Sequence, residues 1–212
     1  MTAPARLVHL VRHGEVANPN HILYGRLPGF SLSDRGIEQA KLVAEFLSRR
    51  DIGYLASSPL ERALQTAQPL AEACGLAIAV DERLTEASNR FQGRAVAGGR
   101  HLFRSPATWW LVRNPFRPSW GEPYSQIAAR VLAAVRSAAQ KAQDHEAVCV
   151  SHQLPIVAAR RRAQGQYLFH DPRRRHCSLG SVTTFTLVAG EVVGVDYAEP
   201  AGHTPSGAVP GA

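Results

Sequence analysis

Residues 6–15 read RLVHLVRHGE, and the rest of the fold can be worked out from this stretch. Its first six residues, RLVHLV at 6–11, are mostly apolar and predict a buried strand that leads directly into the polar sequence RHGE. In open α/β sheets, ligands bind at the carboxyl ends of the strands. A buried strand that ends in a guanidinium, an imidazole and a carboxylate therefore predicts a functional site at its carboxyl end.

Strands and helices alternate along the rest of the chain. The further strands predicted by apolar runs are 54–57, 76–80, 147–151 and a hairpin of 182–188 and 192–197 around Gly190. The helices predicted by the helical spacing of apolar residues are 34–49, 58–75, 124–143 and one that starts near Leu154. This alternation predicts an α/β fold, a three-layer sandwich with a mostly parallel central sheet and helices on both faces.

Local signals mark the ends of two of these helices. Ser33 predicts the N-cap of the helix at 34–49. For the next helix, Ser58 predicts an N-cap, Pro59 suits the first helical position and Glu61 completes a capping box. Gly75 predicts the end of that helix, since glycine readily adopts the left-handed conformation of a helix C-terminus.

Residues 88–121 interrupt the alternation. They hold glycines, all three tryptophans and two X-Pro turns without clear periodicity, so they predict an irregular, lid-like insertion. We expect residues 1–199 to form one domain that includes this insertion. Residues 200–212 are rich in Ala, Gly and Pro and predict a disordered tail.

The bulk composition excludes several classes of protein. Of the 212 residues, 45% are hydrophobic and 19% are charged, as in ordinary globular domains. No apolar run approaches the ~20 residues of a membrane span, and the segment before residue 6 lacks the apolar core of a secretion signal. We therefore expect a cytoplasmic protein with no membrane partner. The three cysteines are too widely spaced for a disulfide framework or a zinc motif.

Three of the predicted strand ends deliver cationic or imidazole side chains to one edge of the sheet. Arg12 and His13 follow the first strand, Arg62 lies in the first helical turn after the second, and His152 follows the strand at 147–151. The guanidinium groups of arginines present N–H donors that match phosphate oxygens two at a time. With a further contact from the imidazole of His152, these side chains predict a phosphate pocket.

His13 is the predicted nucleophile of this pocket. A neutral imidazole can attack phosphorus with one ring nitrogen while the other donates to a backbone carbonyl, and the product is a phosphohistidine. The leaving alkoxide needs a proton, for which Glu86 is the candidate donor because it follows the 76–80 strand and precedes the insertion; Glu15 is the competitor. The arginines balance the phosphate charge, so we expect no metal and no other cofactor.

These residues lie in five motifs that together resemble the histidine phosphatase superfamily, in the branch that includes cofactor-dependent phosphoglycerate mutase. In chain order, the motifs are VRHGE at 11–15, Gly25 followed by LSDRGIEQA at 32–40, SSPLERALQTA at 57–67, Gly121-Glu122-Pro123 with Arg130-Val131, and VSH at 150–152. The resemblance spans about Leu7 to Tyr197 and keeps the family's order. It implies that His13 is phosphorylated, that Arg12, Arg62 and His152 hold the phosphate, and that Glu86 donates the proton.

The chain departs from the family pattern at three places. The family often has an Asn soon after its signature that touches phosphate; Asn18 and Asn20 lie near but outside the mutase spacing, and we take Asn18, with Gly25, as substrate-binding. The family's Gly-x-Trp-Glu-Gly appears only as Phe91-Gln92-Gly93. Gln153 replaces the Gly that commonly follows the second histidine, which predicts an altered pocket there. The first two departures favour a phosphatase over a mutase.

We therefore expect a metal-independent phosphatase that hydrolyses a small phosphate monoester through a phosphohistidine on His13. Two alternatives stay open: phosphoryl transfer of the phosphoglycerate mutase type, and a non-catalytic phosphate-binding regulatory module. The substrate stays open as well, because the lid and groups beyond the phosphate set specificity. Arg113 and Arg117 in the insertion are candidates for contacting a second anionic group of the substrate.

The net charge of +7 favours anionic partners but does not choose among them. The triplets Arg160–Arg162 and Arg173–Arg175 predict solvated faces, with contact to a polyanion as the alternative. Aromatic residues of the kind that stack on bases do not interleave with them, so we expect a small phosphorylated metabolite and no nucleic acid as partner. The sequence predicts no particular oligomeric state.

Overall fold

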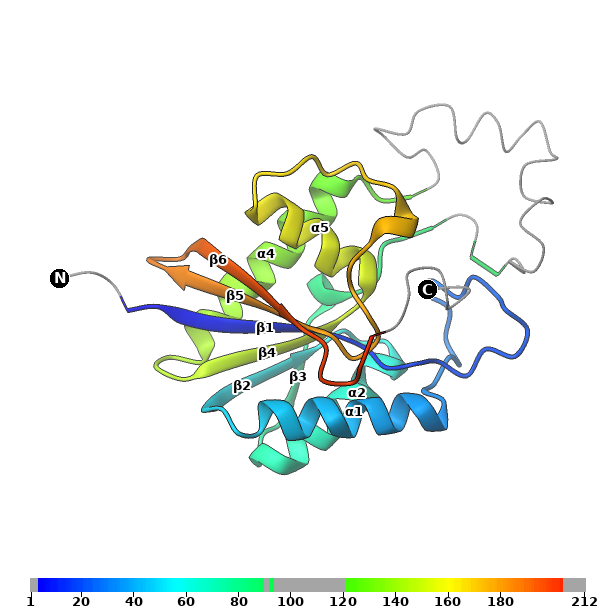
Figure 1. Ribbon diagram of the computed structural model, residues 1–212, viewed down its shortest axis with the longest axis horizontal. Coiled ribbons are helices and arrows are strands. Elements are labelled where there is room, and N and C mark those ends of the chain that lie inside the picture. Colours follow the sequence, from blue (N-terminus) through cyan, green and yellow to red (C-terminus); the bar gives the residue numbers. More distant parts are fainter. Residues whose placement is uncertain (1–3, 90–91, 94–120, 204–212) are drawn as a thin grey trace.

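The computed structural model describes residues 4–89, 92–93 and 121–203, which form a six-stranded sheet between two layers of helices (Figure 1). The strands are β1 (Arg6–Arg12), β2 (Ile52–Ser57), β3 (Ile78–Val80), β4 (Glu146–Ser151), β5 (Val182–Val188) and β6 (Glu191–Ala198). The helices are α1 (Asp34–Leu47), α2 (Glu61–Cys74), α4 (Tyr124–Lys141) and α5 (Gln153–Ala163), with the short 3-10 helices η1 (Glu82–Leu84) and η2 (Pro172–Arg174). The predicted α/β three-layer architecture is confirmed.

The sheet order, β3-β2-β4-β1-β5-β6, places β4 between the two strands that open the chain. β3, β2, β4 and β1 run parallel, and the β5–β6 hairpin adds an antiparallel edge beside β1. After β1 the chain leads to α1 on one face of the sheet, whereas after β4 it enters α5 on the other face (Figure 1). Neighbouring strands whose connections diverge in this way leave a crevice at their carboxyl ends, where ligands bind in such folds.

The core has two halves because successive side chains of a strand point to opposite faces of the sheet. Val8, Leu10 and Cys149 pack with α4 and α5, while Val11 and Val150 pack with α1 and α2. Burial raises the pKa of the Cys149 thiol to about 12, so this cysteine is an inert core residue, as its apolar surroundings in the sequence predict.

One predicted helix start is wrong. α2 begins at Glu61 rather than at Pro59 with Ser58 as its cap, and the residue before it, Leu60, is extended and makes no side-chain cap. The backbone of Ser58 instead donates to the Val150 carbonyl (2.9 Å), which keeps the chain extended beyond β2, and its hydroxyl lies 2.8 Å from His152 Nε2. The predicted helix end is confirmed, with Gly75 in the left-handed conformation at φ 66°.

The residues on either side of the insertion lie next to each other, since Asn89 and Gly121 form an antiparallel bridge. The prediction of a lid falls mostly on residues 90–91 and 94–120, which lie outside the described residues. Of the predicted tail, residues 200–203 form a turn in which the Gly202 amide donates to the Glu199 carbonyl (3.0 Å). Residues 204–212 lie outside the described residues. None of the described helices is both long and apolar enough to cross a membrane.

Two glycines allow the loop after β1 to pack directly against the start of α1. A Cβ built on Gly14 would lie 2.5 Å from the Gly36 carbonyl oxygen, and one built on Gly36 would lie 2.0 Å from the carbonyl oxygen of Glu15. Because both obstacles are backbone atoms, neither can move aside as a side chain can. Glycine at these positions therefore sets how closely α1 approaches the carboxyl end of β1.

This close approach predicts that Gly36→Ala destabilises the fold although alanine favours helices. Overpacking against backbone should lower the free energy of unfolding by about 1–3 kcal/mol, measured by urea denaturation. The matched control is Gly194→Ala in β6, where the added Cβ would meet Thr186 at an ordinary 3.5 Å. Equal stability of the Gly36→Ala variant and the unsubstituted chain would contradict the packing argument.

Candidate active site

The candidate site begins where β1 and β4 end side by side. Arg12 and Ser151 are paired in the last register position, and the His13 amide continues the pairing by donating to the Ser151 carbonyl (3.1 Å). His13 and His152 therefore leave adjacent strands at the same level. Their ring centroids are 5.0 Å apart, at an interplanar angle of 58°. The structure thus brings together two histidines that are far apart in the sequence.

The loop that carries His13 is held by side chains from the two helices on one face. The Gly14 amide donates to Thr66 Oγ1 of α2 (3.1 Å), and the Glu15 amide donates to Gln39 Oε1 of α1 (2.8 Å). The Thr66 hydroxyl in turn donates to the Arg62 carbonyl (2.7 Å), so that α2 is tied to the loop at the turn that bears Arg62. The polar residues of the 32–40 and 57–67 motifs thus fix the position of the imidazole.

Two buried guanidinium groups face this loop. Arg12 and Arg62 are only 4% and 1% exposed. Arg12 donates from Nη1 to the Cys177 carbonyl (2.6 Å), and Arg62 donates from Nη2 to the Gly25 carbonyl (2.7 Å). Within the described ranges, no carboxylate lies at ion-pairing distance from either guanidinium. Backbone carbonyls orient both charges without neutralising them.

Several buried polar atoms here lack a hydrogen-bond partner among the described residues. Buried donors without a partner cost free energy and are rare, so a group of them in one place indicates a ligand site. The atoms around His13 are Arg12 Nε, Arg62 Nε, His152 Nδ1 and the Tyr24 hydroxyl, and a further such atom, Thr183 Oγ1, lies on β5. The Arg62 guanidinium lies over the Tyr24 ring, with its Cζ atom 4.8 Å from the ring centroid. Three N–H or O–H donors and one imidazole nitrogen suit an oxyanion.

His13 has the tautomer and charge state that a nucleophile needs. Its Nδ1 lies 2.8 Å from the Gly14 carbonyl oxygen, which can only accept, so Nδ1 carries the proton and Nε2 keeps its lone pair. Burial, followed by the charges of Arg62 and Arg12, holds the pKa of His13 well below its ordinary value. The ring is therefore neutral at pH 7.

His152 is held neutral in the same way. Burial lowers its pKa well below the ordinary value, and the charge of Arg62 acts in the same direction. Its Nε2 is hydrogen-bonded to the Ser58 hydroxyl, which fixes the ring and leaves Nδ1 for a ligand. A neutral His152 can donate one hydrogen bond to a phosphoryl oxygen when its proton is on Nδ1.

Glu86 lies in the same region as these groups, beyond β3 and η1. Burial raises the pKa of its carboxyl group, against the hydrogen bond donated by the Ala87 amide (2.7 Å) and the charges of Arg62, Arg175 and Arg12. A carboxyl group with a raised pKa keeps its proton longer as pH rises and can donate it to a leaving group.

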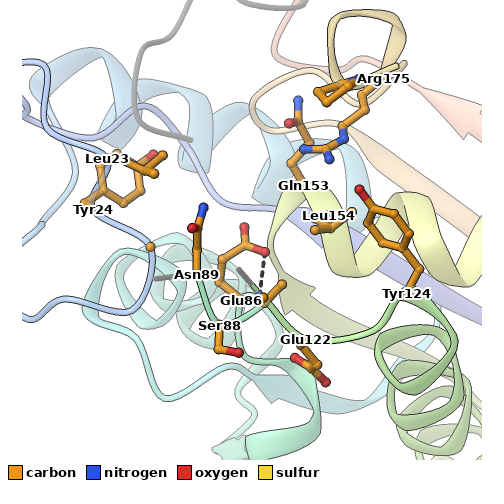
Figure 2. Close-up of a pocket in the computed structure, with 14 residues that line it drawn as sticks. Leu23, Tyr24, Glu86, Ser88, Asn89, Glu122, Tyr124, Gln153, Leu154 and Arg175 are labelled. Carbon is orange, nitrogen blue, oxygen red and sulfur yellow. Dashed lines mark hydrogen bonds between the residues drawn. The ribbon is translucent and has the colours of Figure 1, made fainter. Parts of the chain in front are cut away.

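A pocket of about 270 Å³ opens beside Glu86 (Figure 2). It is bounded by Tyr24 and Gly25 from the loop after β1, by the chain from Glu86 to Asn89, and by Tyr124, Gln153 and Arg175. Figure 2 shows Glu86 between the Tyr24 side and the Tyr124 side of this pocket. The size suits a small organic group, and its position next to Glu86 suits the leaving group of a phosphate ester.

The remaining predicted site residues have different surroundings. The Gly25 carbonyl orients Arg62, and the residue lines the pocket. The Asn18 side chain bonds to both the amide and the carbonyl of Ile22 (3.0 and 2.8 Å) and closes its own loop, so its contact with substrate stays a prediction. Glu15 accepts from the Ser33 hydroxyl (2.9 Å) at the start of α1, which leaves Glu86 as the candidate acid. Arg113 and Arg117 lie outside the described residues.

Sequence reasoning missed two residues of the site. Tyr24 directly precedes Gly25, but a lone tyrosine in a polar loop gives no signal. Arg175 was predicted to lie on a solvated face with its neighbours, and this is wrong: it lines the pocket, donates from Nε to His170 Nε2 (3.0 Å), and burial lowers its pKa. Arg174 is exposed, as predicted. The spacing of residues in a run of arginines does not indicate which of the side chains faces the interior.

Comparison with known proteins gives a family and several relatives. A family model described as the histidine phosphatase superfamily, branch 1, matches residues 8–199. The uncharacterized protein Rv0525 of Mycobacterium tuberculosis is 52% identical over 194 residues, which cover 92% of this chain and 96% of that protein. Phosphoserine phosphatase 1 of Hydrogenobacter thermophilus is 32% identical over 156 residues, which cover 70% of this chain and 72% of that protein.

A solved structure has the same fold. The structure of mycobacterial glucosyl-3-phosphoglycerate phosphatase superposes with a TM-score of 0.69 at 27% sequence identity, covering 86% of this chain and 91% of that one. The match extends over most of both chains, so the fold similarity is not limited to the sheet.

The donors around His13 predict that inorganic phosphate binds here and that Arg62→Ala weakens this binding. Loss of a charge-assisted hydrogen bond costs about 1.5–3 kcal/mol, which corresponds to roughly 10- to 150-fold in Kd. Isothermal titration calorimetry at constant ionic strength measures the effect. Arg49→Ala is the matched control, because Arg49 is exposed and pairs with Glu45 on α1. Unchanged phosphate affinity in the Arg62→Ala variant would rule out this site.

Proposed function

Since the chain belongs to branch 1 of the histidine phosphatase superfamily, we propose that it is a phosphatase that hydrolyses a small phosphate monoester, without a metal, through a phosphohistidine on His13. The observation that carries the proposal is the set of buried polar atoms around His13 that have no hydrogen-bond partner in the described part of the chain, contributed by Arg12, Arg62, His152 and Tyr24. These groups suit phosphoryl oxygens, and the neutral imidazole among them suits attack on phosphorus.

In the first step, His13 Nε2 attacks the phosphorus atom. The donors of Arg12, Arg62 and His152 hold the phosphoryl oxygens, and charge placed in advance where it is needed lowers the barrier. The P–O bond to the leaving group breaks, and Glu86 gives its proton to the departing oxygen. The products are a phosphohistidine, a carboxylate on Glu86 and an alcohol in the adjoining pocket.

In the second step, water replaces the alcohol. The Glu86 carboxylate takes a proton from this water as its oxygen attacks phosphorus, and the bond from phosphorus to Nε2 breaks. Inorganic phosphate leaves, and both His13 and Glu86 return to their starting states. The arginines carry the charge that a metal ion would otherwise balance, so added Mg²⁺ is not expected to raise the rate.

Two departures from the mutase pattern favour transfer to water over transfer to a sugar acid. Asn18 uses its amide group to close its own loop. At the position of the family's Gly-x-Trp-Glu-Gly, Gln92 accepts from the Arg26 amide (3.1 Å) and packs against Gly25. The names of the phosphoserine phosphatase and of the glucosyl-3-phosphoglycerate phosphatase point the same way.

The proposal predicts a trapped phosphoenzyme. Protein that is quenched during turnover of p-nitrophenyl phosphate should carry one acid-labile phosphoryl group, seen by intact mass and located on His13 by peptide mapping. His13→Ala should carry none and lose turnover, whereas the matched control His145→Ala should behave like the unsubstituted chain, because His145 is exposed and pairs with Asp51.

Turnover by His13→Ala, assays with 3-phosphoglycerate and other monoesters, and phosphate binding separate the alternatives. Full turnover by His13→Ala would end the proposal. Conversion of 3-phosphoglycerate to 2-phosphoglycerate faster than phosphate release would assign the chain as a mutase. Binding of phosphate without turnover of any monoester would assign a non-catalytic module.

Glu86→Gln is predicted to slow the hydrolysis of phosphate esters, and the effect should be larger for esters whose leaving group is a stronger base and therefore needs a proton. For an alkyl phosphate, kcat/KM should fall about 10²- to 10⁴-fold, while p-nitrophenyl phosphate, whose leaving group is a weak base, should lose far less. The fall of kcat/KM at high pH, where the raised pKa of Glu86 is passed, should disappear in the variant. Glu82→Gln in η1 is the matched control, and an equal loss on both esters would contradict the role of acid.

A further inference from the structure

Three side chains that could bind a metal meet on the surface, and none of them lines the pocket beside Glu86. His176 precedes β5, and Glu199 and His203 follow β6. One donor atom from each lies within 4.8 Å of the others. His176 Nε2 is 3.8 Å from Glu199 Oε1, and His203 Nδ1 is 3.1 Å from Glu199 Oε2.

We propose that His176, Glu199 and His203 bind a Zn²⁺ ion that acts as a structural clip between the loop before β5 and the segment after β6. Two imidazoles and one carboxylate form a donor set that zinc accepts readily, with water completing the tetrahedron. The site takes no part in the chemistry proposed for His13.

The distances fit a zinc ion with small movements. With Zn–N and Zn–O bonds of about 2.0–2.2 Å, the donor atoms of a tetrahedral site lie roughly 3.4 Å apart. Glu199 Oε1 lies 3.8 Å from His176 Nε2 and 3.2 Å from His203 Nδ1, both within about 0.4 Å of that value. His176 and His203 are both exposed, so their rings can turn to close the remaining distance.

The carboxylate is already oriented for this purpose. Glu199 Oε1 accepts from the Tyr197 hydroxyl and from the Ser178 hydroxyl, each at 2.8 Å, and this holds both carboxylate oxygens close to His203 Nδ1, at 3.2 and 3.1 Å. The His176 ring packs on the Tyr197 ring at 4.4 Å. Such outer contacts orient metal ligands in known sites.

The simpler interpretation is a hydrogen-bonded surface cluster of the kind that His145 forms with Asp51. That pair contains one imidazole and one carboxylate. The cluster at Glu199 adds a second imidazole, and it comes from a different segment of the chain. Two imidazoles on one carboxylate give three donor atoms around a single point, which a hydrogen-bonded pair does not.

The clip would stabilise a loop that the active site uses. Cys177, next to His176, accepts the Arg12 guanidinium on its carbonyl (2.6 Å), and the Gly180 amide donates to the Arg12 carbonyl (3.1 Å). Zinc at His176 would hold this loop to the end of β6. The expected result of binding is a more stable fold, without a contact to the reacting groups.

The test uses the full, tag-free chain after treatment with a chelator. Calorimetry with ZnCl₂ should show one site, and Tm should rise by roughly 5–10 °C at free Zn²⁺ near one hundred times Kd. His203→Ala and Glu199→Gln should each weaken binding at least about 10-fold. Mg²⁺ should not bind, because it prefers oxygen ligands in an octahedron.

Two controls separate this site from other zinc ligands. His145→Ala removes an exposed histidine outside the cluster, and Cys74→Ser removes a partly exposed thiol. Both should bind Zn²⁺ like the unsubstituted chain. Absence of stoichiometric binding, unchanged affinity in the His203→Ala and Glu199→Gln variants, or loss of binding in Cys74→Ser would each overturn the proposal. None of these readouts depends on phosphatase activity.

Discussion

Two like charges, the guanidinium groups of Arg12 and Arg62, are buried side by side with backbone carbonyls as their partners. Burial of a charge without an anionic partner costs several kcal/mol per ion, and repulsion between the two like charges adds to the cost of burying each of them. Core packing, the Gly14–Gly36 contact and the hydrogen bonds of Thr66 hold the groups in place nonetheless. A bound phosphoryl group would offset this electrostatic cost. The free energy gained in this way would add to the affinity and selectivity of the site for a dianion.

Much of this arrangement is predictable from sequence, because it rests on local patterns. The apolar run before Arg12 and the run before Ser151 identify two strands, and parallel strands end at a common edge. That reasoning places His13 next to His152 without any knowledge of distances. It also predicts the fold class, the helix end at Gly75 and the first-turn position of Arg62, all of which the structure has.

The parts that were missed depend on tertiary contacts that compete with local preference. Ser58 has every property of a helix cap, yet its hydroxyl bonds to His152, because a strand-end contact and a buried ring outweigh one cap. Arg175 belongs to a run of arginines, and only packing against Tyr124 and His170 turns it into the pocket. Periodicity describes a single element and its solvent-facing side, and it carries no information on which loop residue meets another loop.

The proposed chemistry makes opposite demands on the two arginines. Their charge favours the neutral His13 that the reaction needs, but it disfavours the protonated Glu86 that the reaction also needs. Positive charge lowers the pKa of the imidazole and keeps it neutral, but the same charge favours the ionised carboxylate, which is useless as an acid. Burial outweighs this effect in the free protein. A phosphate dianion bound between Arg12 and Arg62 would cancel the positive field and add a negative charge of its own, and both changes favour the protonated acid. Substrate binding would thereby hold the proton on Glu86 until the leaving oxygen takes it.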